Sequence, residues 1–470
     1  MARSFLVNAG ALGVSRLFLS VSQVLALPVV ARYLGPAEFG DMAIAMTVVI
    51  FTQLLSDAGL GRSLIRQPTI VDPEWNSVFW LLAGVGIALM FAILLIAPGW
   101  SLFYDRPQLQ ALLWALAPMP FFGAISAVPI ARMERDGQFP KVALIRTVAG
   151  VLGLVGLLGL TISGFGVWAL VAQQLIVIVV QAAWATISSA FRPGLPRRFT
   201  PLGGHIRFAS DNVGVSVIYT AQRQAPVMLI GALLGAAPAG FFVMANRFLN
   251  LPRFAVSGPV SQVAYVRMAA QQQDRARLAE TYIATCHLLS IVVFVPLAIL
   301  AAGAIPVFNV VLSDTWEAAA VVFFLAAPGI AIELATSTLG VLLQAVDQTR
   351  LRLWMVIERT LLRIAAVAIA VQFGLEAVAL TMTLFAIAYT PRYLSFAQRV
   401  TPLRQADVYR AMALPTLASA LAAAAVFWAS MHFSDWQMLA IAGIAIPVTL
   451  AAAALPRLKR IRSDLALLSG

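Results

Sequence analysis

Long apolar runs separated by short polar segments make up almost the whole chain. Most runs reach the length of about 20 residues that an α-helix needs to cross a bilayer. The pattern predicts an all-α integral membrane protein with about 14 transmembrane helices. The predicted spans lie at 7–30, 38–61, 77–97, 109–131, 141–161, 166–189, 208–233, 237–262, 279–301, 317–343, 351–372, 376–397, 409–431 and 436–455.

Composition agrees with this fold class. The chain of 470 residues is 61% hydrophobic and only 11% charged, which is typical of polytopic membrane proteins. The connectors are short, so we expect no extramembrane catalytic module and no enzyme activity. One cysteine and three histidines without ligand spacing predict neither a metal site nor a cofactor. The first apolar run is too long for a signal peptide and is expected to remain as the first span.

The 32 lysine and arginine residues predict the orientation of the spans. Their excess gives a net charge of +12, which in a soluble protein would suggest a nucleic-acid partner. Here most of them lie in every second connector and at the two ends of the chain, whereas the remaining connectors collect acidic residues. Basic connectors stay on the cytoplasmic side of a membrane. The sequence therefore predicts that both termini are cytoplasmic, and it predicts no nucleic-acid partner.

Three short motifs of the first half recur in the same order in the second half. The matched pairs are Leu34–Gly40 with Leu234–Gly240, Asp136 with Asp347, and Gly164–Leu170 with Gly374–Leu380. Short matches arise by chance in apolar sequence, but three matches in one order favour an internal repeat.

The repeat predicts two pseudo-symmetric six-helix bundles around a central cavity, followed by two further helices. The expected parts are an N-terminal lobe at 1–190, a cytoplasmic linker at 191–207, a C-terminal lobe at 208–400, and the last two helices with a basic tail at 401–470. Related lobes that enclose a site are typical of alternating-access transporters. The linker is either the hinge between the lobes or an ordinary cytoplasmic loop.

Ionisable side chains inside the predicted spans are the candidate functional groups. A charge at membrane depth costs at least ~2.5 kcal/mol, so it faces a polar interior or a partner. A guanidinium is permanently charged and binds phosphate oxygens through a rigid fork of donors. The candidates for a substrate-binding cavity are Arg16, Arg223, Arg247 and Arg146, and the candidates for ion coupling or ion pairing are Asp57 and Glu333.

The same residues also have a purely structural interpretation. Ion pairs such as Arg16–Asp57 or Glu333–Arg363 would fix helix packing inside the membrane. At 1.5 Å per residue, Arg16 and Asp57 lie within roughly 5 Å of the same depth. Both interpretations stay open for each single residue, whereas Arg359 is expected near the membrane interface with its stem buried.

Several stretches of the chain resemble a known family. Arg32-Tyr-Leu-Gly-Pro-Ala-Glu-Phe-Gly40, followed by Asp57-Ala-Gly-Leu-Gly61, is similar to the start of the bacterial polysaccharide (O-antigen type) flippases. Ala245-Asn-Arg247 with Leu251-Pro252 supports the resemblance in the second half. The family belongs to the multidrug/oligosaccharidyl-lipid/polysaccharide exporter superfamily.

The resemblance implies a flippase of the bacterial cytoplasmic (inner) membrane. Its substrate would be an undecaprenyl-diphosphate-linked oligosaccharide for surface polysaccharide, lipopolysaccharide or exopolysaccharide. The implied partners are this lipid, the bilayer, and a polysaccharide polymerase with its export machinery. Arg16, Arg223 and Arg247 are then candidates for contact with the diphosphate or the saccharide, and Asp57 is a candidate partner or ion-coupling acid.

Three alternatives remain at this point. A multidrug exporter of the same superfamily would need acidic residues for cations, and the first lobe offers Asp57 only. A flippase of lipid-linked peptidoglycan precursors would use the same chemistry with a different headgroup. A membrane polysaccharide polymerase would need a large outer loop, and the outer connectors are short.

Overall fold

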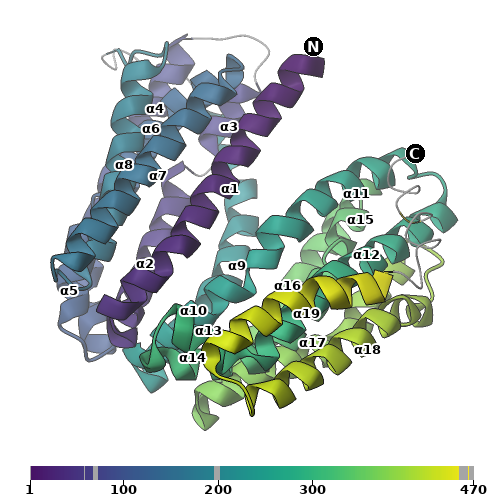
Figure 1. The fold of residues 1–470 in the computed structure, drawn as a ribbon. Helices are drawn as coiled ribbons and strands as arrows, with labels where there is room; N and C mark the ends of the chain where they lie inside the picture. The colour runs from purple at the N-terminus through teal and green to yellow at the C-terminus, as the bar shows by residue number, and fades with distance from the viewer. Residues whose placement is uncertain (1, 58, 67–71, 195–201, 455–463, 465–470) are drawn as a thin grey trace. The chain divides into compact units, whose positions relative to one another are not determined.

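The computed structural model describes residues 2–57, 59–66, 72–194, 202–454 and 464. Every regular element in these ranges is a helix, and none of them is a strand. The chain forms two compact units, Met1–Gly240 and Phe241–Gly470. Figure 1 follows the helices from the N-terminus in purple to the C-terminus in yellow.

The first unit is a bundle of helices of very different lengths. Its helices are α1 (Ala2–Tyr33), α2 (Pro36–Asp57), α3 (Leu60–Ile65), α4 (Asp72–Phe103), α5 (Gln108–Leu116), α6 (Met119–Arg135), α7 (Phe139–Ile162), α8 (Trp168–Ser188) and α9 (Gly203–Leu234). The boundary between the units falls inside α10 (Ala236–Leu249).

The second unit continues with helices that are often interrupted. They are the π-helical turn η1 (Arg253–Ser257), α11 (Gly258–Ala270), α12 (Arg275–Ala302), α13 (Ala304–Val311), η2 (Asp314–Trp316), α14 (Glu317–Ala335), α15 (Leu339–Ala345), α16 (Thr349–Ala370), η3 (Val371–Phe373), α17 (Leu375–Gln398), α18 (Gln405–Ser430) and α19 (Asp435–Ala454).

All of the predicted spans coincide with helices, and some of these helices are broken. The predicted span 109–131 is divided between α5 and α6, and 317–343 between α14 and α15. By length and composition, eight helices of the described residues qualify as membrane spans, with two shorter apolar helices beside them. Large apolar side chains such as Leu95 and Leu102 are 81% exposed, as expected for helices that face lipid.

The turns of the internal repeat share backbone geometry. Gly164 and Gly374, which precede α8 and α17, both have positive φ. Gly137 and Asp347 also have positive φ, and the next residue of each turn donates its N–H to a carbonyl five positions back. Asp347 is thus the structural counterpart of Gly137, so the predicted match with Asp136 is shifted by one residue.

The glycines at positions 40 and 240 let two backbones approach closely. A Cβ on Gly40 would overlap the carbonyl of Ala236, and a Cβ on Gly240 would overlap the carbonyl of Pro36. The starts of α2 and α10 therefore pack against each other through the same position of both repeat motifs. The motifs differ at Gly235, whose φ of +94° favours glycine.

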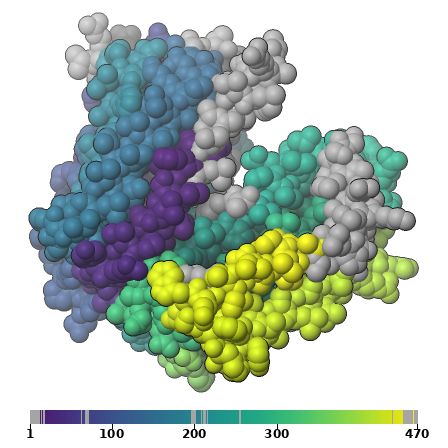
Figure 2. Space-filling view, in the orientation of Figure 1, coloured from purple at the N-terminus to yellow at the C-terminus, as the bar shows by residue number. Residues whose placement is uncertain are grey.

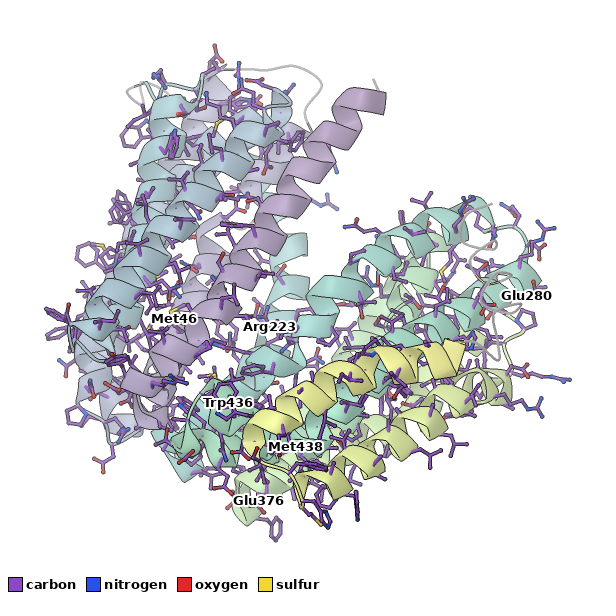
Figure 3. The ribbon with its side chains drawn as sticks, viewed as in Figure 1. Met46, Arg223, Glu280, Glu376, Trp436 and Met438 are labelled. Atoms are coloured by element: carbon purple, nitrogen blue, oxygen red, sulfur yellow. The ribbon has the colours of Figure 1, made fainter. Side chains whose placement is uncertain are left out.

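Each unit has its own apolar core. In the first, Trp75, Leu82 and Val128 are fully buried between α4 and α6. In the second, α12 packs against α18 and α19, and these last two helices form a continuous surface in the space-filling view (Figure 2). On α19, Met438 is 1% exposed and Trp436 is 72% exposed, so one face of this helix is buried and the other is open (Figure 3).

The predicted lobes and the compact units have different boundaries. The prediction follows the repeat and ends the first lobe at 190, whereas the first unit includes α9. This helix packs against α2 and α3, which explains its assignment to the first unit. The division at 190, 207 and 400 stays a prediction.

Candidate functional site

A buried carboxylate in the second unit is held by two arginines. The side chain of Glu333 on α14 is 7% exposed. Its Oε1 lies 2.8 Å from Nη2 of Arg359 and 2.9 Å from Nη1 of Arg363, both on α16. Nη1 of Arg363 also donates to Oε2 at 3.3 Å. We refer to Glu333, Arg359 and Arg363 as the Glu333 cluster.

Helix geometry explains why these three residues meet. Arg359 and Arg363 are four positions apart, so both guanidiniums leave the same face of α16. Glu333 lies in the last turn of α14, just before the break that precedes α15. At this break the carbonyl of Thr336 accepts a hydrogen bond from the buried hydroxyl of Tyr282 at 3.4 Å. The break thus positions the end of α14 against α12 as well as α16.

Aromatic residues of α17 surround the cluster. The guanidinium carbon of Arg359 lies 5.4 Å from the ring centre of Tyr393, within the range of a cation–π contact. One turn earlier, the hydroxyl of Tyr389 donates to Glu358 at 3.3 Å. Glu358 also accepts two hydrogen bonds from Arg392, both of 2.8 Å. The polar groups therefore continue from the buried cluster to a more exposed ion pair that joins Glu358 on α16 to Arg392 on α17.

Glu333 and Arg359 border a very small cavity, and the cluster has unsatisfied donors. The cavity has a volume of about 10 Å³, and its wall also includes Thr336, Thr390 and Phe385. The Nε atoms of Arg359 and Arg363 are buried, and among the described residues neither has a hydrogen-bond partner. Two positive charges face one negative charge here, so the cluster carries an excess of one positive charge.

Two ion pairs of the first unit each join one acid to one base. Asp41 on α2 accepts two hydrogen bonds from Arg106, of 3.0 and 3.3 Å. Nearby, Tyr104 follows α4 and donates to the carbonyl of Met228 at 3.2 Å. Burial raises the pKa of Tyr104 to about 12, so its hydroxyl stays a donor at neutral pH.

The predicted cavity residue Arg146 belongs to such a pair. Its Nη2 lies 3.3 Å from Oε1 of Glu134, and both side chains are about a quarter to a third exposed. The pair joins α7 to α6. This contact gives Arg146 a structural role and makes it a weaker candidate for substrate binding.

The other predicted residues occupy separate places. Arg223 is exposed on α9 in the first unit (Figure 3), and Arg247 is exposed on α10 in the second. Asp57 ends α2, and its Oδ1 lies 3.4 Å from the backbone nitrogen of Gly61, a long hydrogen bond. The side chain of Arg16 lies outside the described residues, so its predicted pairing with Asp57 stays a prediction.

Sequence reasoning missed three features. It counted Asp57 as the only acid that the first lobe offers within its spans, whereas Asp41 is also buried there, on α2. It placed Arg359 at the membrane interface, whereas its guanidinium binds the buried Glu333. It also treated the histidines as isolated, whereas the fully buried His287 on α12 has its Nδ1 2.7 Å from Oδ2 of Asp464. The sequence separation of the partners hides both contacts. For Arg359 the usable signal was its spacing of four from Arg363.

A wider opening lies elsewhere on the second unit. It measures about 450 Å³, and its wall includes Arg275, Gln348 and Arg399. The two arginines make it basic, and Arg399 also stacks over the ring of Phe396 at 5.2 Å. Within the described ranges, no group of histidine, cysteine or carboxylate residues is placed to hold a metal ion.

Comparison with known sequences finds relatives that are named for the biosynthesis of succinoglycan, lipopolysaccharide or teichuronic acid. The succinoglycan biosynthesis transport protein ExoT of Rhizobium meliloti is 27% identical over 73% of this chain and 69% of its own length. The lipopolysaccharide biosynthesis protein WzxC of Escherichia coli is 22% identical over 57% of this chain, and the match spans 55% of WzxC, less than two thirds of that protein. The teichuronic acid biosynthesis protein TuaB of Bacillus subtilis is 21% identical over 65% of this chain and 64% of its own length.

Comparison with solved structures confirms the fold class. The lipid II flippase MurJ superposes with a TM-score of 0.79 at 14% identity, over 95% of this chain and 99% of MurJ. An inward-facing multidrug transporter of the MATE family in the MOP superfamily gives a TM-score of 0.60 at 16% identity, over 83% of this chain and 98% of its own. The protein therefore has an all-helical multi-pass membrane fold.

The family assignment follows from a third comparison. The model of the family described as polysaccharide biosynthesis protein matches residues 29–321, more than half of the chain. The match includes the Arg32–Gly40 motif and the Ala245–Arg247 motif, on which the resemblance rested. The resemblance is thereby confirmed, and the chain belongs to the polysaccharide biosynthesis protein family.

Proposed function

We propose that the protein is a flippase for lipid-linked oligosaccharides. Its substrate is an undecaprenyl-diphosphate-linked saccharide repeat unit, which it moves from the inner to the outer leaflet of the bacterial cytoplasmic membrane. The observation that carries the proposal is the family match over residues 29–321 on a fold similar to that of a lipid II flippase. The names of ExoT and WzxC support a role in the synthesis of exopolysaccharide or lipopolysaccharide.

The chemistry of the chain suits this substrate. A diphosphate carries negative charge that must be compensated on the way through the bilayer, and arginine is the side chain that does so with a fixed charge. The bundles contain arginines within membrane-spanning helices, whereas the lipid tail needs only the apolar surface around them. Movement by alternating access, with both termini cytoplasmic and without an enzymatic step, is part of the proposal.

The predicted site residues have different roles in this proposal. Arg223 and Arg247 are exposed on helices of the bundles and are proposed to contact the diphosphate or the saccharide, together with Arg16. Arg146 is proposed mainly to hold α7 against α6, because it already binds Glu134. Asp57 is proposed as a partner of Arg16 or an ion-coupling acid.

The test is the location of the lipid-linked repeat units in a strain that lacks the gene. The proposal expects them to accumulate in the inner leaflet, and expression of the protein to restore surface polysaccharide. Accumulation of unpolymerised units in the outer leaflet would favour the polymerase alternative and would contradict the proposal.

Substitutions test the arginines. Arg16→Ala and Arg223→Ala are each expected to abolish polymer export while the protein still inserts, as measured by membrane fractionation and by surface polysaccharide staining. Normal surface polysaccharide in a strain that carries both substitutions would remove these residues from the substrate path. Efflux of cationic dyes by the purified protein in vesicles would instead support the multidrug alternative.

A further inference from the structure

The Glu333 cluster has the charge balance of an occupied anion site. Arg359 and Arg363 converge on a single carboxylate, which takes one donor group from each of them. A buried ion pair is stable when its charges and its donors are satisfied. Here neither condition holds, because one positive charge is in excess and both Nε donors are buried without an acceptor among the described residues.

Further positive charge is directed at the same place. Arg253, on the π-helical turn η1 between α10 and α11, interacts electrostatically with Glu333. The residues around the cluster add hydroxyl groups and aromatic edges, from Thr336, Tyr389 and Tyr393, but no second acid. The carboxylate of Glu358, which accepts a hydrogen bond from Tyr389 on the cavity wall, is already held by Arg392 through two hydrogen bonds of 2.8 Å. The surroundings therefore favour an additional anion over a cation.

The size of the cavity shows what must move. A volume of about 10 Å³ is close to the smallest that admits one water molecule, and it is far too small for a diphosphate. A diphosphate binds Arg359 and Arg363 only if the Glu333 carboxylate gives up its place between them. Glu333 is at the end of α14, next to the helix break at Thr336, and a change in helix direction at this break would move its carboxylate.

We propose that Arg359 and Arg363 form a diphosphate-binding site in the second unit, and that Glu333 occupies this site until the diphosphate of the lipid-linked substrate displaces it. The carboxylate acts as a built-in competitor of the substrate. It keeps the two arginines together when no substrate is bound, and it lowers their affinity enough for release. The identity of the anion rests on the proposed function, whereas the presence of an anion site rests on the cluster itself.

The test measures binding to the purified full-length protein in detergent. The probes are geranylgeranyl diphosphate, inorganic pyrophosphate and, as the neutral control, geranylgeraniol, each followed by isothermal titration calorimetry. Glu333→Gln removes the competing charge and is expected to bind geranylgeranyl diphosphate about tenfold more tightly. Arg359→Gln and Arg363→Gln are each expected to bind it about tenfold more weakly.

Two further variants separate the site from general damage. Arg350→Gln removes an exposed arginine of the same helix and is expected to bind like the wild type. The double variant Glu333→Gln with Arg363→Gln keeps the charge of the cluster unchanged, so it serves when a single variant fails to fold. It is expected to bind geranylgeranyl diphosphate more weakly than Glu333→Gln does, because it presents one guanidinium instead of two.

The outcomes are distinct. If pyrophosphate follows the same order of variants as geranylgeranyl diphosphate, the site recognises the diphosphate itself; if only the isoprenyl compound does, the lipid contributes as well. Either result supports the site. Equal affinity of wild type, Glu333→Gln and the double variant for both diphosphates would overturn it and leave the cluster as a link between α14 and α16. A strain that exports polysaccharide without this protein would refute the proposed function and leave the binding result intact.

Discussion

Two ion pairs of the first unit and the Glu333 cluster of the second unit differ in their charge balance. In the first unit, Asp41 pairs with Arg106 and Glu134 pairs with Arg146, one acid to one base. In the second unit, Glu333 is shared by Arg359 and Arg363. A neutral pair satisfies its own charges and needs nothing else. A cluster with excess charge has capacity for a ligand.

The comparison suggests a rule for choosing among membrane-embedded charges. An intramembrane ionisable residue is a functional candidate by default. A single partner of opposite charge neutralises it and so removes most of the reason to expect a function. By this rule Arg146 becomes a weaker candidate for substrate binding, whereas Arg359 and Arg363 become stronger candidates. The following predictions test the rule, in order of the expected effect on stability.

The largest effect is expected from Glu333→Ala. This substitution leaves two buried guanidiniums without a counter-charge, and breaking a buried pair in this way costs about 3–5 kcal/mol. The free energy of unfolding is measured by titration with sodium dodecyl sulfate. The exposed Glu280 on α12 (Figure 3) supplies the matched control, because Glu280→Ala is expected to change it by less than about 0.5 kcal/mol. Similar values for the two variants would contradict the buried cluster.

A smaller loss is expected from Asp41→Ala in the first unit. It removes two charge-assisted hydrogen bonds, but Arg106 is 38% exposed and regains water, so the expected loss is about 2 kcal/mol. A double-mutant cycle with Arg106→Ala measures the interaction itself. A coupling energy near zero would show that the two side chains lie close together without contributing to stability.

Arg146→Ala is expected to have a weaker effect. Its pair with Glu134 is partly exposed, and such pairs contribute about 0.2–1 kcal/mol. Polysaccharide export should stay close to the wild-type level, measured by surface staining. Complete loss of export with normal insertion would return Arg146 to the substrate path and would break the rule drawn from the comparison.

Arg223→Ala is expected to leave stability unchanged and still to abolish export. The side chain is exposed on α9, so its removal should shift the free energy of unfolding by no more than about 0.5 kcal/mol. Arg223→Lys is the informative companion, because lysine keeps the charge and loses the fork of donors. Full export by Arg223→Ala would exclude the residue from substrate binding.

The positions of the helices could be predicted because they depend on local sequence. Apolar runs of spanning length define them, and each predicted span coincides with one helix or with a series of interrupted helices. The break at 336–338 was not predicted, because a short interruption of a helix depends on its neighbours as much as on its own residues. The Asp136 match was off by one residue, since Gly137 and Asp347 share the positive φ that defines the turn.

The candidate site was predicted only in part. Sequence reasoning considered Glu333 with Arg363, residues that the structure brings together at 2.9 Å. It separated Arg359 from them, because the linear sequence does not show whether an arginine within a helix extends to the membrane interface or turns toward a buried carboxylate. The contact of His287 with Asp464 could not be predicted, because a single contact between a helix and the distant C-terminal tail leaves no periodic pattern in the sequence.

The sequence by itself determined that this is a multi-pass helical membrane protein of the polysaccharide biosynthesis family, because apolar length and short motifs are local properties. Only the tertiary structure decided which charges neutralise each other, because the partners come from different helices. That choice makes Arg146 half of a neutral pair and Arg359 part of a cluster with unused donors. In a medium of low dielectric constant this difference in pairing is large in energy, and it separates the residues that hold the bundle together from those that can hold a substrate.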